Sequence, residues 1–183
     1  MSAAGTPGAA RDARAPAIDA AADAAPRPAA TALAPSATDD AVPEGYEPAF
    51  IEAGSFLGLC GPIYQRRRDD GRAPVLALRV QPKHLNLRGI VHGGLLVTLA
   101  DSALGHAINH ARQQPLGVVT VSLATDFVET ARLGDWIEAD VDIQRVGGRM
   151  AFANCYLHVG ERRILRASGV FAVVQAVPGA QHP

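Results

Sequence analysis

Asp101 is an acidic residue in the middle of a long apolar segment. The residues from about Gly93 to Ala111 are predicted to form one helix that is apolar almost all round. Buried aspartates are rare unless they are paired, because desolvating a carboxylate costs several kcal/mol. Asp101 therefore has either a structural role, tethering an amide or pairing with an arginine, or a chemical role as a nucleophile or general base.

The segment His92-Gly93-Gly94 leads directly into this helix. Two glycines let a ligand approach the backbone closely, and the first amides of a helix have no internal acceptors and lie at its positive end. Such amides can stabilise a carbonyl oxygen that gains negative charge during attack. The alternative interpretation is a turn followed by a helix cap, with no chemical role.

The distance between these two features constrains the assembly. Asp101 lies eight residues after Gly93, which corresponds to about 12 Å along a helix. One carbonyl group cannot contact both, because catalytic contacts are about 3 Å long. If both groups are catalytic, they come from two subunits whose helices pair antiparallel in a two-fold dimer. The surplus apolar surface of the helix favours the same dimer.

The elements that must position these residues are predicted from β-rich runs separated by short polar breaks. A lead-in helix is predicted over Phe50–Phe56. Two strands precede the long helix and four follow it, the four as an antiparallel meander. This order predicts an α+β fold in which one helix packs on one antiparallel sheet. The predicted strands are Gly61–Arg66, Val75–Gln81, Gly117–Glu129, Trp136–Val146, Met150–Val159 and Ile164–Gln175.

Several spaced motifs together resemble the hotdog-fold acyl-CoA thioesterases of the phenylacetate-pathway type, within the 4-hydroxybenzoyl-CoA thioesterase superfamily. The resemblance covers roughly Tyr46–Val174. It implies a long central helix wrapped by an antiparallel sheet of about six strands, assembled as homodimers or dimers of dimers, with an acyl-CoA substrate and no metal or other cofactor. The motifs are Asn86, His92-Gly93-Gly94, Leu99-Ala100-Asp101, Val119-Thr120-Val121 and Leu133-Gly134-Asp135.

The resemblance also implies roles for individual residues. Asp101 becomes the attacking carboxylate or the base that activates water, and the Gly93 amide binds the thioester carbonyl. Thr120, on the same subunit as Asp101, becomes the residue that holds the hydrolytic water, and a small shift in register would favour Ser122 instead. The remaining positions are Asn86 near the carbonyl or leaving sulfur, His92 orienting the loop, and Gly94 beside the substrate.

Other polar residues give weaker signals. His106 and His110 have a metal-ligand spacing on the predicted helix, but no third ligand accompanies them, so we expect no metal site. Arginines suit the phosphates of CoA. Arg132 and Arg149, which lie at predicted strand-end turns, are the favoured candidates for this contact.

Composition limits the partners and the location. The chain has 17 Lys and Arg against 18 Asp and Glu, which gives no reason to expect nucleic-acid binding. Cys60 and Cys155 are too far apart in the sequence for a disulfide framework and suit a reducing compartment. No apolar run approaches the ~20 residues of a membrane helix. We therefore expect a cytoplasmic protein that does not enter a membrane.

The sequence divides into three segments. Residues 1–45 are rich in alanine and proline and contain no aromatic residue, so we expect disorder there. Residues 46–177 form the predicted hotdog domain, and residues 178–183 a flexible tail. We expect the domain to hydrolyse an acyl-CoA thioester. A non-catalytic acyl-CoA-binding module and a 3-hydroxyacyl thioester dehydratase remain alternatives, and the acyl group and the choice between CoA and acyl-carrier protein stay open.

Overall fold

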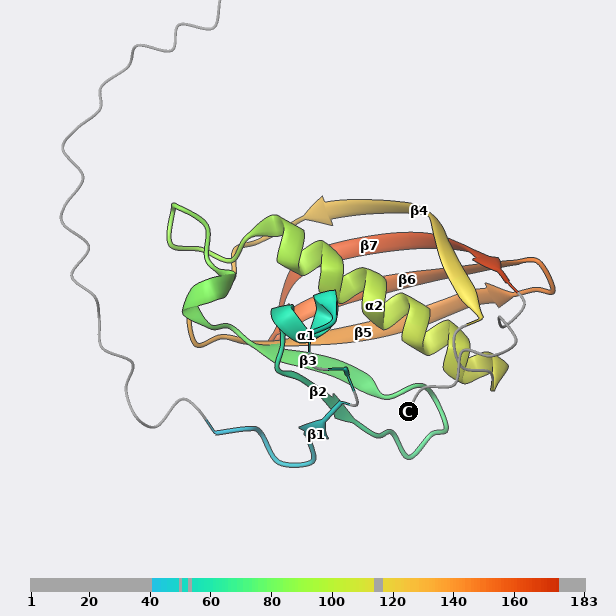
Figure 1. Cartoon of the computed structure of the whole chain (residues 1–183), viewed down its shortest axis with the longest axis horizontal. Coiled ribbons are helices and arrows are strands. Elements are labelled where there is room, and N and C mark those ends of the chain that lie inside the picture. The colour runs from blue at the N-terminus through green and yellow to red at the C-terminus, as the bar shows by residue number, and fades with distance from the viewer. Residues whose placement is uncertain (1–40, 50, 53, 114–116, 175–183) are drawn as a thin grey trace, which may run out of the picture. The chain divides into compact units, whose positions relative to one another are not determined.

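The computed structural model describes residues 41–49, 51–52, 54–113 and 117–174 (Figure 1). Of the segment 1–45 that was expected to be disordered, only residues 41–45 are described. There the Ala41 carbonyl accepts a hydrogen bond from Arg79 Nη2 at 2.7 Å. The predicted tail, residues 178–183, and the last residues of the predicted domain, 175–177, lie outside the described part.

The structure confirms the predicted α+β hotdog fold, in which the long helix α2 lies along one antiparallel sheet (Figure 1). The strand order in the sheet is β1-β2-β3-β5-β6-β7-β4. The elements are β1 (Glu47–Pro48), α1 (Phe56–Cys60), β2 (Ile63–Arg66), β3 (Val75–Arg79), the 3-10 turn η1 (Pro82–His84), α2 (Gly93–Arg112), β4 (Val118–Phe127), β5 (Trp136–Val146), β6 (Met150–Val159) and β7 (Arg162–Val173).

Three details differ from the sequence-based expectations. The sheet has seven strands rather than about six, because the two-residue β1 pairs with β2. The predicted four-strand meander is wrong at β4, which pairs with β7 at the sheet edge, while β5 pairs with β3. The lead-in helix begins at Phe56, where the preceding Ser55 side chain accepts the Gly58 N–H and caps it.

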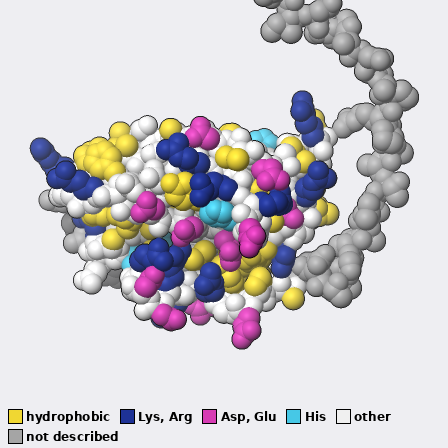
Figure 2. Space-filling model, turned by 180° about the vertical axis from the view of Figure 1, so that it is seen from behind, with side chains coloured by type: hydrophobic (Ala, Val, Ile, Leu, Met, Phe, Trp, Pro, Cys, Tyr) yellow, Lys and Arg dark blue, Asp and Glu magenta, His cyan; other side chains and the backbone are white. Residues whose placement is uncertain are grey.

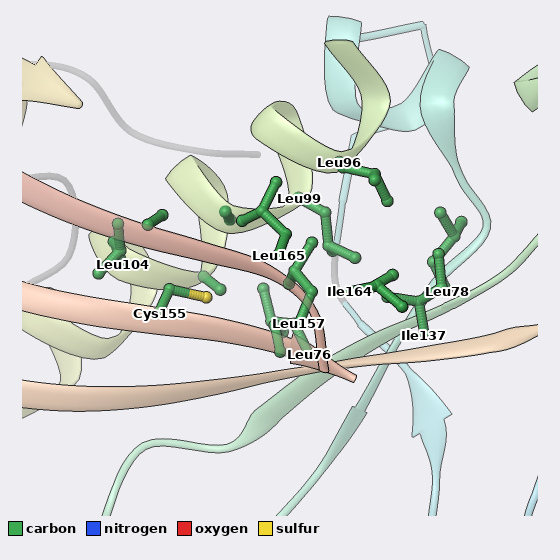
Figure 3. Packing of buried hydrophobic residues seen from close by; sticks show 14 of the residues in the cluster. Leu76, Leu78, Leu96, Leu99, Leu104, Ile137, Cys155, Leu157, Ile164 and Leu165 are labelled. Carbon is green, nitrogen blue, oxygen red and sulfur yellow. The ribbon is translucent and has the colours of Figure 1, made fainter. Parts of the chain in front are cut away.

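The core lies between α2 and the inner face of the sheet (Figure 3). Alternate residues of β5, β6 and β7 point toward the helix, as expected for an antiparallel sheet with one covered face. The side of α2 that faces the sheet is fully buried, whereas Val97, Asp101 and Ser102 are half-buried. The buried helix residues are Leu96, Leu99, Ala100, Ala103, Leu104, Ala107 and Ile108.

The outer face of the sheet carries interspersed positive and negative side chains (Figure 2). Arg166 and Asp126 form an ion pair of 2.9 Å across β7 and β4, and Arg68 pairs with Asp140. Such a mixed, charged face suits contact with water. Within the described residues, no helix has the length and apolar character needed to cross a membrane.

Candidate active site

The start of α2 presents one backbone amide that is free to bind a ligand. His92 is the N-cap residue, and its Nδ1 accepts the Gly94 N–H at 2.9 Å. This bond uses the Gly94 amide, which therefore cannot also donate to a substrate. The Gly93 N–H has no acceptor among the described residues, as expected for the first residue of a helix.

Phe127, at the end of β4, explains why residue 93 is a glycine. A Cβ atom at Gly93 would lie 3.1 and 3.2 Å from two carbons of the Phe127 ring. The Phe127 side chain is 57% exposed and packs against the start of α2, beside the free amide.

The loop before α2 is held by backbone hydrogen bonds on both sides. The His92 N–H donates to the His84 carbonyl, and the Val91 N–H donates to the Ala131 carbonyl, each at 2.9 Å. Asn86 Oδ1 accepts the Arg88 N–H at 2.8 Å in a local turn. The Nδ2 group of Asn86 has no acceptor among the described residues, so it is available to donate to a ligand.

Asp101 and Thr120 meet on the half-buried side of α2. Thr120 Oγ1 donates a hydrogen bond of 2.8 Å to Asp101 Oδ1. A register shift, or β-bulge, separates Thr120 from Ser122 in β4, and bulges often redirect side chains next to functional sites. The structure thus brings Thr120, and not Ser122, to the carboxylate. No arginine or lysine pairs with Asp101 in the described part of the chain.

Asp101 and Thr120 lie in an open depression of about 330 Å³. It is lined by polar side chains and by apolar side chains from three different elements, α1, α2 and β4. No cationic side chain lines it. The lining residues are Phe56, Val97, Thr98, Asp101, Ser102, Thr120 and Leu123.

The predicted site residues fall into two groups within one subunit. Asp101 and Thr120 form the first group, and Gly93 and His92 form the second, at the helix start, with Asn86 in the turn that precedes them. Both groups depend on the single helix Gly93–Arg112, so about 12 Å separates the Gly93 amide from Asp101. One subunit therefore does not bring the acid and the amide together.

His84 is a structural residue of this site that the sequence did not single out. The side chain is 4% exposed. Its Nδ1 accepts the Gln81 N–H at 2.9 Å, and its Nε2 hydrogen-bonds the Cys60 carbonyl at 2.7 Å. Burial lowers the pKa of His84, and the hydrogen bond to Cys60 offsets this only in part. A neutral His84 thus links α1 to the loop that ends at His92.

The other candidate binding residues lie far apart in the structure. Arg132 follows Ala131, whose carbonyl binds the loop before α2, while Arg149 lies in the turn between β5 and β6 at the opposite end of the sheet. Both are exposed. Burial and the neighbouring His110 lower the pKa of His106. No group of three or more His, Cys, Asp or Glu side chains in the described ranges is arranged to hold a metal ion.

Comparison with known proteins places the chain in a family. A model of the family described as "Thioesterase superfamily" matches residues 88–165. A protein of Pseudomonas aeruginosa named "Putative esterase PA0474" is 48% identical over 130 residues, which are 71% of this chain and 96% of that protein.

Two solved structures share the fold. A variant of the phenylacetic acid degradation protein PaaI from Thermus thermophilus is 26% identical, with a TM-score of 0.57 over 65% of this chain and 98% of that one. The BH2602 protein from Bacillus halodurans, solved with CoA, is 28% identical, with a TM-score of 0.54 over 62% of this chain and 74% of that one. The chain therefore belongs to the thioesterase superfamily and is a hydrolase with the hotdog fold.

Proposed function

We propose that this protein is an acyl-CoA thioesterase in which the Asp101 carboxylate drives the hydrolysis. The observation that carries the proposal is the Asp101–Thr120 pair in an open depression, where no cationic partner among the described residues explains the acid structurally. A half-exposed carboxylate that is oriented by one hydrogen bond keeps its second oxygen available for water or for substrate. This arrangement favours a chemical role over a structural one.

The chemistry follows from the two groups of residues. As the base, Asp101 takes a proton from water while the water oxygen bonds to the thioester carbon. As the nucleophile, Asp101 would form a mixed anhydride that water then hydrolyses. In both cases the Gly93 N–H stabilises the oxyanion and the CoA thiolate leaves. In this proposal Asn86 Nδ2, which has no acceptor among the described residues, donates to the same carbonyl, and His92 holds the loop through its bond to Gly94.

The site requires two subunits. A carbonyl that receives the Gly93 amide at about 3 Å cannot also contact an acid about 12 Å along the same helix. Two α2 helices that pair antiparallel would place Gly93 of one subunit beside Asp101 of the other, giving two equivalent sites per dimer. We therefore propose a homodimer as the active unit, which a dimer of dimers would preserve.

The exposed edge of the sheet supports this assembly. β4 has ten residues and, among the strands that the structure describes, pairs only with β7. Several of its apolar side chains are exposed, including Val119 at 54% and Val121 at 59%. Long apolar edge strands are aggregation-prone unless they are covered. A partner that covers β4 would also cover the depression around Asp101, since Thr120 belongs to both.

CoA binding is proposed at the helix-start end of the molecule. Arg132 lies there, and its guanidinium has no carboxylate partner among the described residues. The similar protein from Bacillus halodurans was solved with CoA, which supports a CoA thioester over other thioesters. Arg149 lies too far away, at the opposite end of the sheet, to bind the same phosphate within one subunit.

A thiol-release screen tests the proposal. The purified full-length chain is incubated with CoA thioesters of acetyl, medium-chain and aromatic acyl groups, and both products are identified. Release of free CoA and the free acid supports the assignment. An enoyl thioester from a 3-hydroxyacyl-CoA, or tight binding by calorimetry without any thiol release, would replace it with a dehydratase or with a binding module.

A further inference from the structure

Phe56 is an aromatic residue held at the edge of the depression that contains Asp101. It belongs to α1, far from Asp101 in the sequence, yet it lines the same depression. Its side chain is 70% exposed in the single subunit. A large aromatic ring in this position offers apolar area beside the reacting group.

Helix α1 is tied down firmly enough to keep Phe56 in place. Lys83 Nζ donates to the Leu59 carbonyl at 2.9 Å and also to the Gly61 carbonyl. His84 Nε2 binds the carbonyl between them, that of Cys60, at 2.7 Å. Neighbouring side chains of η1 thus hold three successive carbonyls at the end of α1.

Packing fixes the opposite side of α1. Leu57 packs against the core. A Cβ atom at Gly58 would lie 2.5 Å from the Glu52 carbonyl oxygen, so this turn of the helix fits closely against the preceding segment. With Leu57 turned inward, Phe56 is presented outward over the depression, where α1, α2 and β4 meet.

The depression suits the acyl part of a thioester better than the nucleotide part. Its apolar walls are Phe56, Val97 and Leu123, and none of its lining residues is an arginine or lysine. The phosphates of CoA need cationic partners, which lie elsewhere. An acyl group whose carbonyl is beside Asp101 can instead extend along these apolar side chains.

We infer that Phe56 is a specificity-determining residue, which contacts the apolar body of the acyl group and favours acyl groups larger than acetyl. This inference rests on the proposed thioesterase function and adds the acyl-binding wall to it. An acetyl group has no atoms beyond its methyl, so it gains little from Phe56. A medium-chain or aromatic acyl group covers the ring and removes apolar area from water on both partners.

The experiment compares F56A and F56L with L59A in the full-length chain. Leu59 is a matched control, because it lies on the same helix, is 67% exposed and does not line the depression. The kcat/KM of each variant is measured with acetyl-CoA, octanoyl-CoA and phenylacetyl-CoA. Size-exclusion chromatography and thermal unfolding of each variant report assembly and folding.

For F56A we expect kcat/KM to fall about tenfold or more with octanoyl-CoA and phenylacetyl-CoA, and to stay within about twofold with acetyl-CoA. F56L should restore activity on octanoyl-CoA. If it also restores activity on phenylacetyl-CoA, the contact is generally apolar; if not, the ring is required. L59A should match the wild type with all three substrates.

Three outcomes would overturn the inference. The first is an F56A ratio of octanoyl to acetyl activity equal to that of the wild type. The second is an equal loss on all substrates together with a changed elution volume, which would make Phe56 a subunit contact. The third is a loss of kcat/KM with octanoyl-CoA and phenylacetyl-CoA in L59A that equals the loss in F56A. If the wild type releases thiol and the variants give any of these outcomes, the proposed thioesterase function stands and only the role of Phe56 is overturned. A wild type that releases no thiol contradicts both the proposed function and the role of Phe56.

Discussion

Asp101 is held by one hydrogen bond, from Thr120 to Oδ1, and this determines what its replacement should do. In D101N the side-chain carbonyl still accepts from Thr120, but the negative charge is lost. We expect kcat to fall by about 100-fold or more, as for removal of a general base. The midpoint of thermal unfolding should change little, because the Asp101 carboxylate forms no ion pair with the described residues and so has none to lose. A D101N variant that keeps more than about a tenth of the wild-type turnover would contradict the assignment.

Gly93 allows the backbone amide itself to be tested. In G93P the N–H is removed, while proline is well tolerated at the first position of a helix. The preceding residue, His92, already has backbone angles of φ −65° and ψ 129°. This extended conformation is the one that a residue before proline favours. We expect kcat to fall about 10²–10³-fold, as for loss of one oxyanion donor.

The control for this change is G93A, which adds bulk but keeps the amide. Its methyl group meets the Phe127 ring at 3.1 Å, and that exposed ring can shift. G93A should therefore lose much less activity than G93P in the same thiol-release assay. Equal losses in the two variants would mean that space, and not the N–H group, matters at this position.

Among the elements, those with strong local patterns could be predicted from the sequence. The helix α2 and the strands β5 and β6 begin where their apolar periodicity and flanking turns indicated. The partner of β4 could not be predicted in this way, because pairing with β7 is set by how α2 carries the chain across the sheet.

The Asp101–Thr120 contact agrees with the family resemblance. Phe56 was missed because no local pattern connects α1 to the depression.

Helix α2 and strand β7 pack closely at Gly169. A Cβ atom at Gly169 would lie 2.7 Å from the Phe171 ring and 2.9 Å from Leu104. Overpacking a core in this way costs about 1–3 kcal/mol, so G169A should lower the free energy of unfolding by that amount in a denaturant titration. G148A is the control: a Cβ there meets nothing within 4 Å, and it should change stability by less than about 0.5 kcal/mol. Similar values for both would contradict the packing argument.

The link between α1 and the helix start predicts a pH-dependent stability. The pKa of His84 is lowered in the folded state, so the unfolded chain binds the proton more readily. The stabilisation is therefore complete above the unfolded pKa of about 6.5 and is lost as the pH falls through the folded value. Unfolding free energies of the wild type and H84Q should differ most above pH 7, and the difference should shrink in acid. A difference that does not vary with pH would contradict this role of His84.

The two sides of the described domain differ in the side chains that they expose. The outer face carries mixed charges that suit water (Figure 2). The other side presents the half-buried surface of α2, the exposed strand β4 and the depression around Asp101. Association through α2 and β4 would cover this apolar surface and would bring together the two groups of site residues that one subunit keeps apart.

Subunit complementation is the sharpest test of a site shared between two subunits. D101N and G93P chains, each nearly inactive alone, are unfolded together, refolded as a mixture and assayed for thiol release. In a mixed dimer, one site would combine the intact Gly93 of the D101N chain with the intact Asp101 of the G93P chain. Random pairing should then restore about a quarter of wild-type activity, since half of the dimers are mixed and each has one intact site. A mixture no more active than its two components would contradict a site shared between subunits.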